Sequence, residues 1–206
     1  MQQIKNIIFD LGGVLLNLDI PKTTHAFELL GAPEFKTLFG LGRAESFIKS
    51  YEVGHIDDDQ FVTDLQQLTG GKSRQEVTDA WNAMLLDFPK ERIDLLNELR
   101  KKYRIYLFSN TNSLHLTAFH KIFSDTFNGA SLDNEFSKTW YSHLIRMRKP
   151  DVTAYEFVIG DAQLDATETA FIDDALINVE GARKAGLYGI HLEPGKTILD
   201  LDWNLS

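Results

Sequence analysis

The spacing of the hydrophobic residues changes near residue 89. Before it, from about Ile20 to Phe88, apolar residues recur at helical spacings of three and four, and no strand pattern is visible. The run Ser73-Arg74-Gln75-Glu76 is a capping box, which predicts the start of a helix. We therefore expect an all-α segment of about 70 residues.

Strand and helix patterns alternate after residue 89. Predicted strands span Tyr103–Phe108, Thr139–His143, Thr169–Ile172 and Tyr188–Leu192, and predicted helices span Lys90–Lys102, Val152–Gly160 and Asn178–Ala185. A further buried strand begins at Ile4 and is broken at Asp10-Leu11-Gly12-Gly13. Such alternation predicts an α/β fold with a parallel sheet and right-handed crossovers. The polar stretch Phe127–Lys138 is expected to be a loop or short helix.

Length and composition narrow the class of protein. The chain has 206 residues, which is about 1.4 times the length of a typical domain. This length suits one domain with a sizeable insertion. The absence of cysteine excludes disulfides, thiolate metal sites and a cysteine nucleophile. A net charge of −9 argues against binding to nucleic acid or an anionic membrane. The N-terminal apolar run Ile7–Phe9 is too short for a targeting signal, so we expect a cytoplasmic protein.

Polar side chains follow four of the predicted strands. They are Asp10, Ser109-Asn110, Lys149 and Asp173-Asp174, and in a parallel sheet they would meet at its carboxyl edge. Carboxylates are the ligands that Mg²⁺ prefers, whereas a lysine, a hydroxyl and backbone N–H groups suit a phosphoryl group. The pattern therefore predicts a combined magnesium and phosphate site, which supplies positive potential inside an acidic protein.

A carboxylate at such a site can act as a nucleophile and form an aspartyl-phosphate. Asp10 is the best candidate because it ends a strand against a glycine turn. Lys149, Ser109 and the backbone amides near Leu11–Gly13 would hold the phosphoryl oxygens. Water would then hydrolyse the acyl-phosphate.

Four segments in order resemble the motifs of the haloacid dehalogenase-like hydrolase superfamily. They are Phe9-Asp10-Leu11-Gly12-Gly13-Val14-Leu15, Leu107-Phe108-Ser109-Asn110, Arg148-Lys149-Pro150-Asp151 and Phe171-Ile172-Asp173-Asp174, with Asn178–Gly186 as a further similar segment. The resemblance covers nearly the whole chain. It implies a Rossmann-like three-layer core from residues 1–17 and 89–206, with residues 18–88 inserted as an all-α cap of the C1 type.

The resemblance also implies roles for individual residues. Metal ligands would be Asp10, the backbone carbonyl of Gly12, Asp173 and Asp174. Phosphate would be bound by Leu11, Gly12, Ser109, Asn110 and Lys149. The implied activity is a Mg²⁺-dependent phosphatase for a small phosphorylated metabolite. The motifs are most similar to the branch with α-glucose-1-phosphate phosphatases and epoxide hydrolase phosphatase domains, so sugar phosphates are a candidate substrate class.

Gly12 departs from the pattern of this superfamily, whose phosphatases usually carry a second aspartate two residues after the nucleophile. That aspartate protonates the leaving group, and its loss would cost about 10²–10⁴-fold in rate. Asp19 or a residue of the cap could supply the proton instead. Alternatively, the leaving group needs little help, as with the hemiacetal oxygen of a sugar 1-phosphate.

Other functions stay open at this stage. A dehalogenase or a phosphotransferase could use the same scaffold, and the glycine at position 12 also allows a degenerate, non-catalytic member of the superfamily. A receiver domain is disfavoured, because the acidic pair of receiver domains follows the first strand, whereas Asp173-Asp174 comes after Lys149 in this chain. A nicotinamide-binding protein is disfavoured because Gly12-Gly13 lacks the G-x-G-x-x-G spacing. The physiological substrate and the oligomeric state are not predicted.

Several residues have a simpler interpretation beside a functional one. We expect Asp57-Asp58-Asp59 to start a helix rather than bind metal, and Asp173-Asp174 to be both a helix N-cap and a metal site. Arg148 is expected to be solvated. His115 is either a residue on a helix surface or one that faces the substrate, and Trp81 is expected in the core of the cap.

Overall fold

A computed structural model describes residues 3–40 and 44–205. Its centre is a five-stranded sheet in the order β3-β2-β1-β4-β5, in which all neighbours pair in parallel. The strands are β1 (Asn6–Phe9), β2 (Arg104–Ser109), β3 (Thr139–Tyr141), β4 (Thr169–Asp173) and β5 (Tyr188–His191). All residues of β1 and β4 are buried, as expected for central strands covered on both faces. The predicted α/β class is thereby confirmed.

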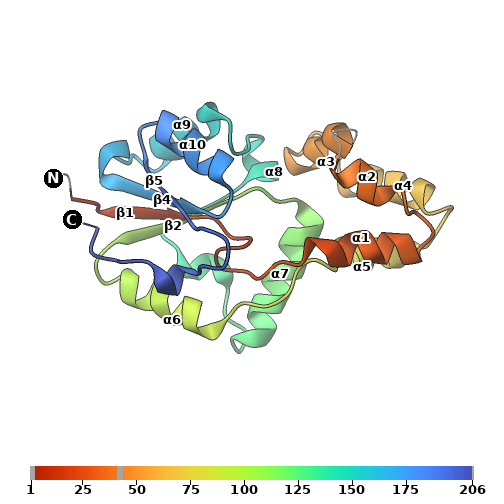
Figure 1. Cartoon of the computed structure of the whole chain (residues 1–206), viewed down its shortest axis with the longest axis horizontal. Helices are drawn as coiled ribbons and strands as arrows, with labels where there is room; N and C mark the ends of the chain where they lie inside the picture. The colour runs from red at the N-terminus through yellow and green to blue at the C-terminus, as the bar shows by residue number, and fades with distance from the viewer. Residues whose placement is uncertain (1–2, 41–43, 206) are drawn as a thin grey trace.

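Helices cover both faces of the sheet (Figure 1). On one face lie α6 (Lys90–Leu99) and α7 (Ser113–Thr126), and on the other α9 (Val152–Asp161) and α10 (Leu176–Lys184). Neighbouring residues of β1 serve opposite faces, because side chains alternate along a strand. Ile7 belongs to the hydrophobic cluster with α6 and α7, and Ile8 belongs to the cluster with α9 and α10. The core thus has three layers.

A helical insert leaves the core between β1 and β2 and extends beyond one end of the sheet (Figure 1). It contains α1 (Ile20–Leu29), α2 (Phe35–Gly40), α3 (Ala44–Glu52), α4 (Asp58–Leu68) and α5 (Arg74–Asn82). The insert has its own hydrophobic cluster, which includes Phe27, Phe61 and Trp81. The predicted capping box is present, with Ser73 and Glu76 bonded to each other's backbone N–H groups.

Two chain segments join this insert to the core and run antiparallel. Leu18 and Leu85 form an antiparallel bridge. The backbone bonds around it are Asn17 N–H to Asp87 O, Leu86 N–H to Asn17 O and Asp19 N–H to Met84 O. The two segments therefore support each other and enter the insert as a pair.

The remaining elements are short. They are α8 (Ser142–Ile145) and three 3₁₀ turns, η1 (Leu132–Glu135), η2 (Ala166–Glu168) and η3 (Ile198–Asp200). The turn η1 lies in the polar stretch that was expected to be a loop or short helix. Among the helices in the described ranges, none has both the length and the apolar character needed to cross a bilayer.

Some boundaries differ from those predicted. The strand expected to reach His143 ends at Tyr141, because the chain turns into α8. The pair Asp173-Asp174 is not the N-cap of α10, since the cap position is Ala175, which has no side-chain cap bond. Asp57 is the N-cap of α4, and its carboxylate accepts the Gln60 N–H at 2.9 Å, as predicted.

Candidate active site

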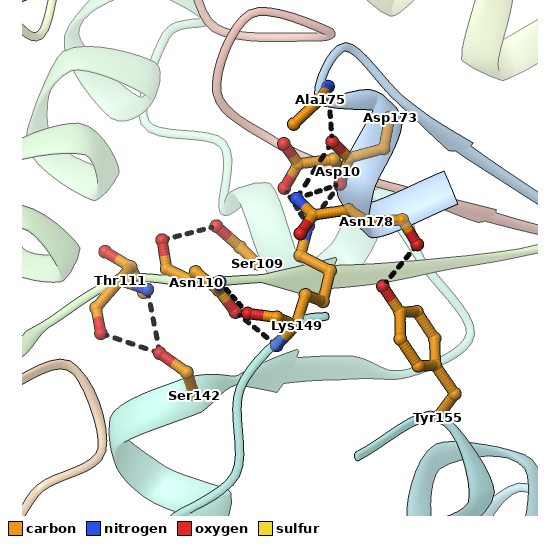
Figure 2. Close-up of polar contacts among 10 residues, drawn as sticks. All are labelled: Asp10, Ser109, Asn110, Thr111, Ser142, Lys149, Tyr155, Asp173, Ala175 and Asn178. Atoms are coloured by element: carbon orange, nitrogen blue, oxygen red, sulfur yellow. Dashed lines mark hydrogen bonds and ion pairs between the residues drawn. The ribbon is translucent and has the colours of Figure 1, made fainter. Parts of the chain in front are cut away.

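Three buried side chains meet at the carboxyl edge of the sheet. Figure 2 shows the Lys149 side chain pointing between Asp10, at the end of β1, and Asp173, at the end of β4. Its Nζ lies 2.6 Å from Asp10 Oδ1 and 2.7 Å from Asp173 Oδ2. All three residues are at most 8% exposed. These residues therefore converge as predicted, but Lys149 does not end a strand, because it lies in the turn after α8.

The charges of this cluster depend on one another. Burial would lower the pKa of Lys149, but the carboxylates of Asp10 and Asp173 outweigh it and raise that pKa, so the ammonium keeps its charge. Burial raises the pKa of Asp10 to about 7 against the opposing effect of Lys149, and the Asp173 charge adds to the rise. One lysine does not fully compensate the neighbouring carboxylates, so a further cation would stabilise their ionised form.

A third carboxylate completes a candidate metal centre. Oxygen atoms of Asp10, Asp173 and Asp174 all lie within 4.8 Å of one another. Burial and the Asp173 charge raise the pKa of Asp174. Gly13 has φ +73°, and a Cβ at this position would run into the Asp174 carboxylate. The glycine turn thus allows Asp174 to approach β1, and this oxygen-rich group fits Mg²⁺.

Asp173 is held by more than Lys149. Its Oδ1 accepts the Ala175 N–H at 2.8 Å, and both of its oxygens lie 3.0 Å from Asn178 Nδ2 (Figure 2). These donors come from the turn after β4 and from the first turn of α10. They fix the carboxylate at the point where it faces Lys149 and Asp10.

Asn110 has a role that the sequence did not reveal. Its Nδ2 donates to the Lys149 carbonyl at 2.9 Å, and its Oδ1 accepts the Lys149 N–H at 2.9 Å. The side chain predicted to bind phosphate is therefore engaged with the backbone of Lys149. Ser109 is buried beside it and, like Leu11 and Gly12, lines the same cavity.

A match to a protein-family model decides the family. The model describes a haloacid dehalogenase-like hydrolase and covers residues 4–186. The chain belongs to the haloacid dehalogenase-like hydrolases. The resemblance seen in the sequence is thereby confirmed.

Individual relatives cover nearly the whole chain. A D-ribitol-5-phosphate phosphatase of Bacteroides thetaiotaomicron is 30% identical over 93% of each chain. The crystal structure of a haloacid dehalogenase family enzyme of the same organism, in complex with magnesium and inorganic phosphate, is 34% identical, with a TM-score of 0.86 and coverage of 97% of each chain. A hydrolase of this family from Porphyromonas gingivalis is 29% identical, with a TM-score of 0.85 and coverage of 94% and 93%.

In this member of the family, a cavity of about 370 Å³ opens above the carboxylate cluster. Its floor is formed by Asp10 and Ser109 at the ends of β1 and β2, and by Lys149 in the turn that follows α8. Its upper wall is formed mainly by apolar residues of the insert and the adjoining segments, Leu16, Leu18, Ile20, Trp81, Met84 and Leu85. The helical insert thus faces the carboxyl edge of the sheet. Trp81 is both in the core of the insert and at the cavity.

His115 is buried at this cavity, so its interpretation as a helix-surface residue is wrong. Its ring stacks on Trp81 at a centroid distance of 4.7 Å. Nε2 lies 3.1 Å from the Trp81 carbonyl and must donate there, while Nδ1 faces the Asn112 amide at 3.2 Å. Burial lowers the pKa of His115 to about 4, so the ring is neutral at physiological pH.

Glu52 and Arg148 form a contact between the insert and the core. Arg148 Nη2 lies 2.9 Å from Glu52 Oε2, and the two side chains are only 24% and 21% exposed. Arg148 is therefore not the solvated residue expected from the sequence. Glu52 ends α3 and lines the cavity. No motif pointed to it, since an isolated glutamate in a helix carries no local signal.

The acidic run Asp57-Asp58-Asp59 joins the insert to the core. Asp58 accepts the Tyr51 hydroxyl at 2.7 Å and also the Ser113 hydroxyl of α7. Asp59 forms an ion pair with Arg74 at 2.7 Å. Within the described residues, the single carboxylate group close enough to hold a metal is the one around Asp10, so this run stays a structural feature.

Proposed function

We propose that this chain is a Mg²⁺-dependent phosphatase that hydrolyses a small phosphorylated metabolite through an aspartyl-phosphate on Asp10. The buried Lys149 ammonium, held between Asp10 and Asp173 beside a third carboxylate, carries the proposal. The relatives support the enzyme class, a phosphomonoester hydrolase of the haloacid dehalogenase-like family. The magnesium and phosphate bound to one of them support the cofactor.

In this proposal the metal is held by Asp10, Asp173, Asp174 and the backbone carbonyl of Gly12. Bound Mg²⁺ supplies positive charge that favours ionised Asp10 and the approach of an anionic phosphate. Asp10 then attacks phosphorus. Lys149, the Ser109 hydroxyl and the backbone N–H groups near Leu11–Gly12 stabilise the phosphoryl oxygens. Water cleaves the acyl-phosphate and restores Asp10.

The substrate class follows from the cavity and from one relative. A cavity of about 370 Å³ admits a small phosphorylated molecule. The relative named D-ribitol-5-phosphate phosphatase matches over 93% of both chains, which supports a sugar or polyol phosphate. We assign residues 18–88 as the cap that closes over this molecule, and residues 1–17 and 89–206 as the catalytic core.

The dehalogenase alternative is less favoured. Dehalogenases of this superfamily need no metal, whereas this chain places three carboxylates within 4.8 Å of one another. Such a cluster is electrostatically costly without a cation. Phosphate release that continues undiminished in the presence of a chelator would contradict the proposal.

The test measures phosphate release from p-nitrophenyl phosphate with Mg²⁺. Wild-type protein should be active, EDTA should abolish the activity, and Asp10→Asn should lower it by at least about 10⁴-fold because no nucleophile remains. Asp94→Asn, at an exposed position in α6, is the matched control and should retain wild-type activity. Full activity of Asp10→Asn would overturn the nucleophile assignment.

A further inference from the structure

We propose that Glu52, delivered by the helical insert, protonates the leaving oxygen of the substrate in place of the aspartate missing at position 12. The proposal rests on the phosphatase function proposed above and adds a catalytic residue to it. The need for it is chemical: an alkoxide is a poor leaving group, and Gly12 has no proton to give. An acid on the opposite wall of the cavity can reach the leaving oxygen, since the oxygen points away from Asp10 during in-line attack.

Five ionisable side chains line the cavity in the described part of the chain: Asp10, Glu52, His115, Lys149 and Asp174. Asp19, which the sequence suggested as an alternative acid, does not line it. The acid must therefore be found among these five or be water.

Four of the five are committed elsewhere. Asp10 is the nucleophile, Asp174 belongs to the metal group, and Lys149 is held between two carboxylates. His115 is neutral, and its one ring proton is donated to the Trp81 carbonyl. Glu52 is left: it pairs with Arg148, but it has no role in binding the phosphate or the metal.

The backbone around Glu52 is fixed against the core. The preceding residue, Tyr51, is buried, and its hydroxyl bonds Asp58 and accepts the Leu114 N–H at 3.2 Å. Two residues later, Gly54 lies so close to the His143 carbonyl that a Cβ would collide with it. Glu52 is therefore held on the cavity wall and does not swing freely with the insert.

The side chain of Glu52 is oriented by the same turn that positions the catalytic lysine. Arg148 Nη2 contacts Glu52 Oε2 at 2.9 Å, and the next residue is Lys149. The turn thus carries the lysine of the proposed phosphate site and, through Arg148, holds the Glu52 carboxyl group at the wall of the same cavity. The contact between Arg148 and Glu52 therefore couples the position of the Glu52 carboxyl group to that of Lys149.

Glu52 is also able to carry a proton. Burial raises its pKa, although the charges of Arg148, Lys49 and Lys149 all act against this rise. No acidic neighbour is needed to produce the effect. The group can thus alternate between carboxyl and carboxylate during turnover.

The two half-reactions balance. In the first, a carboxylate oxygen of Asp10 bonds to phosphorus, the bond from phosphorus to the alkoxide oxygen breaks, and the Glu52 proton passes to that oxygen to give the alcohol. In the second, water attacks phosphorus and gives a proton to Glu52. The bond between phosphorus and the Asp10 oxygen breaks. Inorganic phosphate leaves, and both residues return to their starting states.

The test compares Glu52→Gln with wild type on three probes with increasingly poor leaving groups: p-nitrophenyl phosphate, phenyl phosphate and glycerol 2-phosphate. Nitrophenolate leaves without a proton, so the loss there should stay within about threefold. The loss should rise through phenyl phosphate to about 100-fold with glycerol 2-phosphate. Phenyl and nitrophenyl phosphates differ little in size, so a defect of the cavity wall would affect both alike.

Two further variants sharpen the test. Asp19→Asn, at the base of the insert but outside the cavity, should match wild type on all three probes. Glu52→Asp keeps a carboxyl group and should show a smaller dependence on the leaving group than Glu52→Gln. A loss by Glu52→Gln that is equal for all probes, or no loss at all, would overturn the inference and leave the phosphatase function intact. Wild-type protein inactive on all three would contradict that function itself and this inference with it.

Discussion

Burial decides the charge of single residues at this site. Asp10 and His115 both have strongly shifted pKa values, near 7 and near 4, because desolvation disfavours the ionised form of each. The consequences are opposite. Asp10 requires a cation to act as an anion, whereas His115 stays neutral, lines the cavity and stacks on Trp81.

The buried His115 predicts a specific pH dependence of stability. Between pH 6.5 and 4, the unfolded chain binds a proton at this residue while the native chain does not, so stability falls as the pH falls. The loss from pH 7 to pH 5 should be about 2 kcal/mol in the free energy of unfolding. His115→Gln should lack this component.

Urea unfolding of both proteins at pH 7 and pH 5 measures the difference. His25→Gln, at an exposed position on α1, is the control and should follow wild type. An unchanged difference between wild type and His115→Gln at the two pH values would show that the histidine is not held neutral.

At the scale of elements, close contact between α10 and the turn after Lys149 positions the site. Gly181 of α10 faces the Pro150 carbonyl, and a Cβ there would collide with it and lie 2.9 Å from Tyr155 Cε2. A Cβ added at Gly160 of α9 would instead meet no atom within 4 Å. The two glycines therefore form a natural pair for comparison.

Gly181→Ala should destabilise the protein by about 1–3 kcal/mol through overpacking, and it should lower phosphatase activity because the turn that carries Lys149 must shift. Gly160→Ala should stabilise it by about 0.5–1 kcal/mol, because alanine favours an exposed helix, and leave activity unchanged. Thermal melts and assays with p-nitrophenyl phosphate measure both effects. Equal behaviour of the two variants would mean that α10 does not press on this turn.

The sequence predicted the elements with strong local patterns. Buried apolar runs show where the strands before Asp10 and Asp173 end. The alternation with helices makes the strands parallel, so these two ends lie at the same edge of the sheet. A helix at His115 was one of two interpretations of that residue, but the bounds of α7 were not predicted, although Asn112 at its N-cap and the spacing of Phe119 and Phe123 indicate them.

The sequence alone does not predict contacts between residues that lie far apart in the chain. The sequence could not show that the Asn110 side chain binds the backbone of Lys149, because this depends on how β2 meets a turn 39 residues later. The pairing of Arg148 with Glu52 depends likewise on how the insert lies against the core. Both pairs arise from tertiary packing, which leaves no periodic signal along the chain.

For the molecule as a whole, the net charge of −9 contrasts with its need to bind anions. The carboxylates of Asp10, Asp173 and Asp174 at the carboxyl edge of the sheet repel one another, and a bound cation would relieve this repulsion. Ligands that bind only the native state stabilise it by mass action. A bound Mg²⁺ would therefore add to the stability of the protein as well as take part in the proposed chemistry.

Mg²⁺ at about 100 times its dissociation constant should add about 2.7 kcal/mol to the free energy of unfolding. This corresponds to a rise of about 5–10 °C in melting temperature for a chain of this size. Asp174→Asn should remove most of the rise, whereas Asp59→Asn, in the other acidic cluster, should not. A rise that persists in Asp174→Asn would place the ion elsewhere.

The paired segments that join the insert to the core act as one unit. Asn17 exchanges backbone hydrogen bonds with Asp87 and Leu86, and Leu18 forms a bridge with Leu85, so the connection is a short two-stranded ribbon and not two independent linkers. The insert is therefore held to the core by these backbone bonds in addition to the contact between Glu52 and Arg148. Two separate attachments thus keep side chains of the insert and of the core on the walls of one cavity.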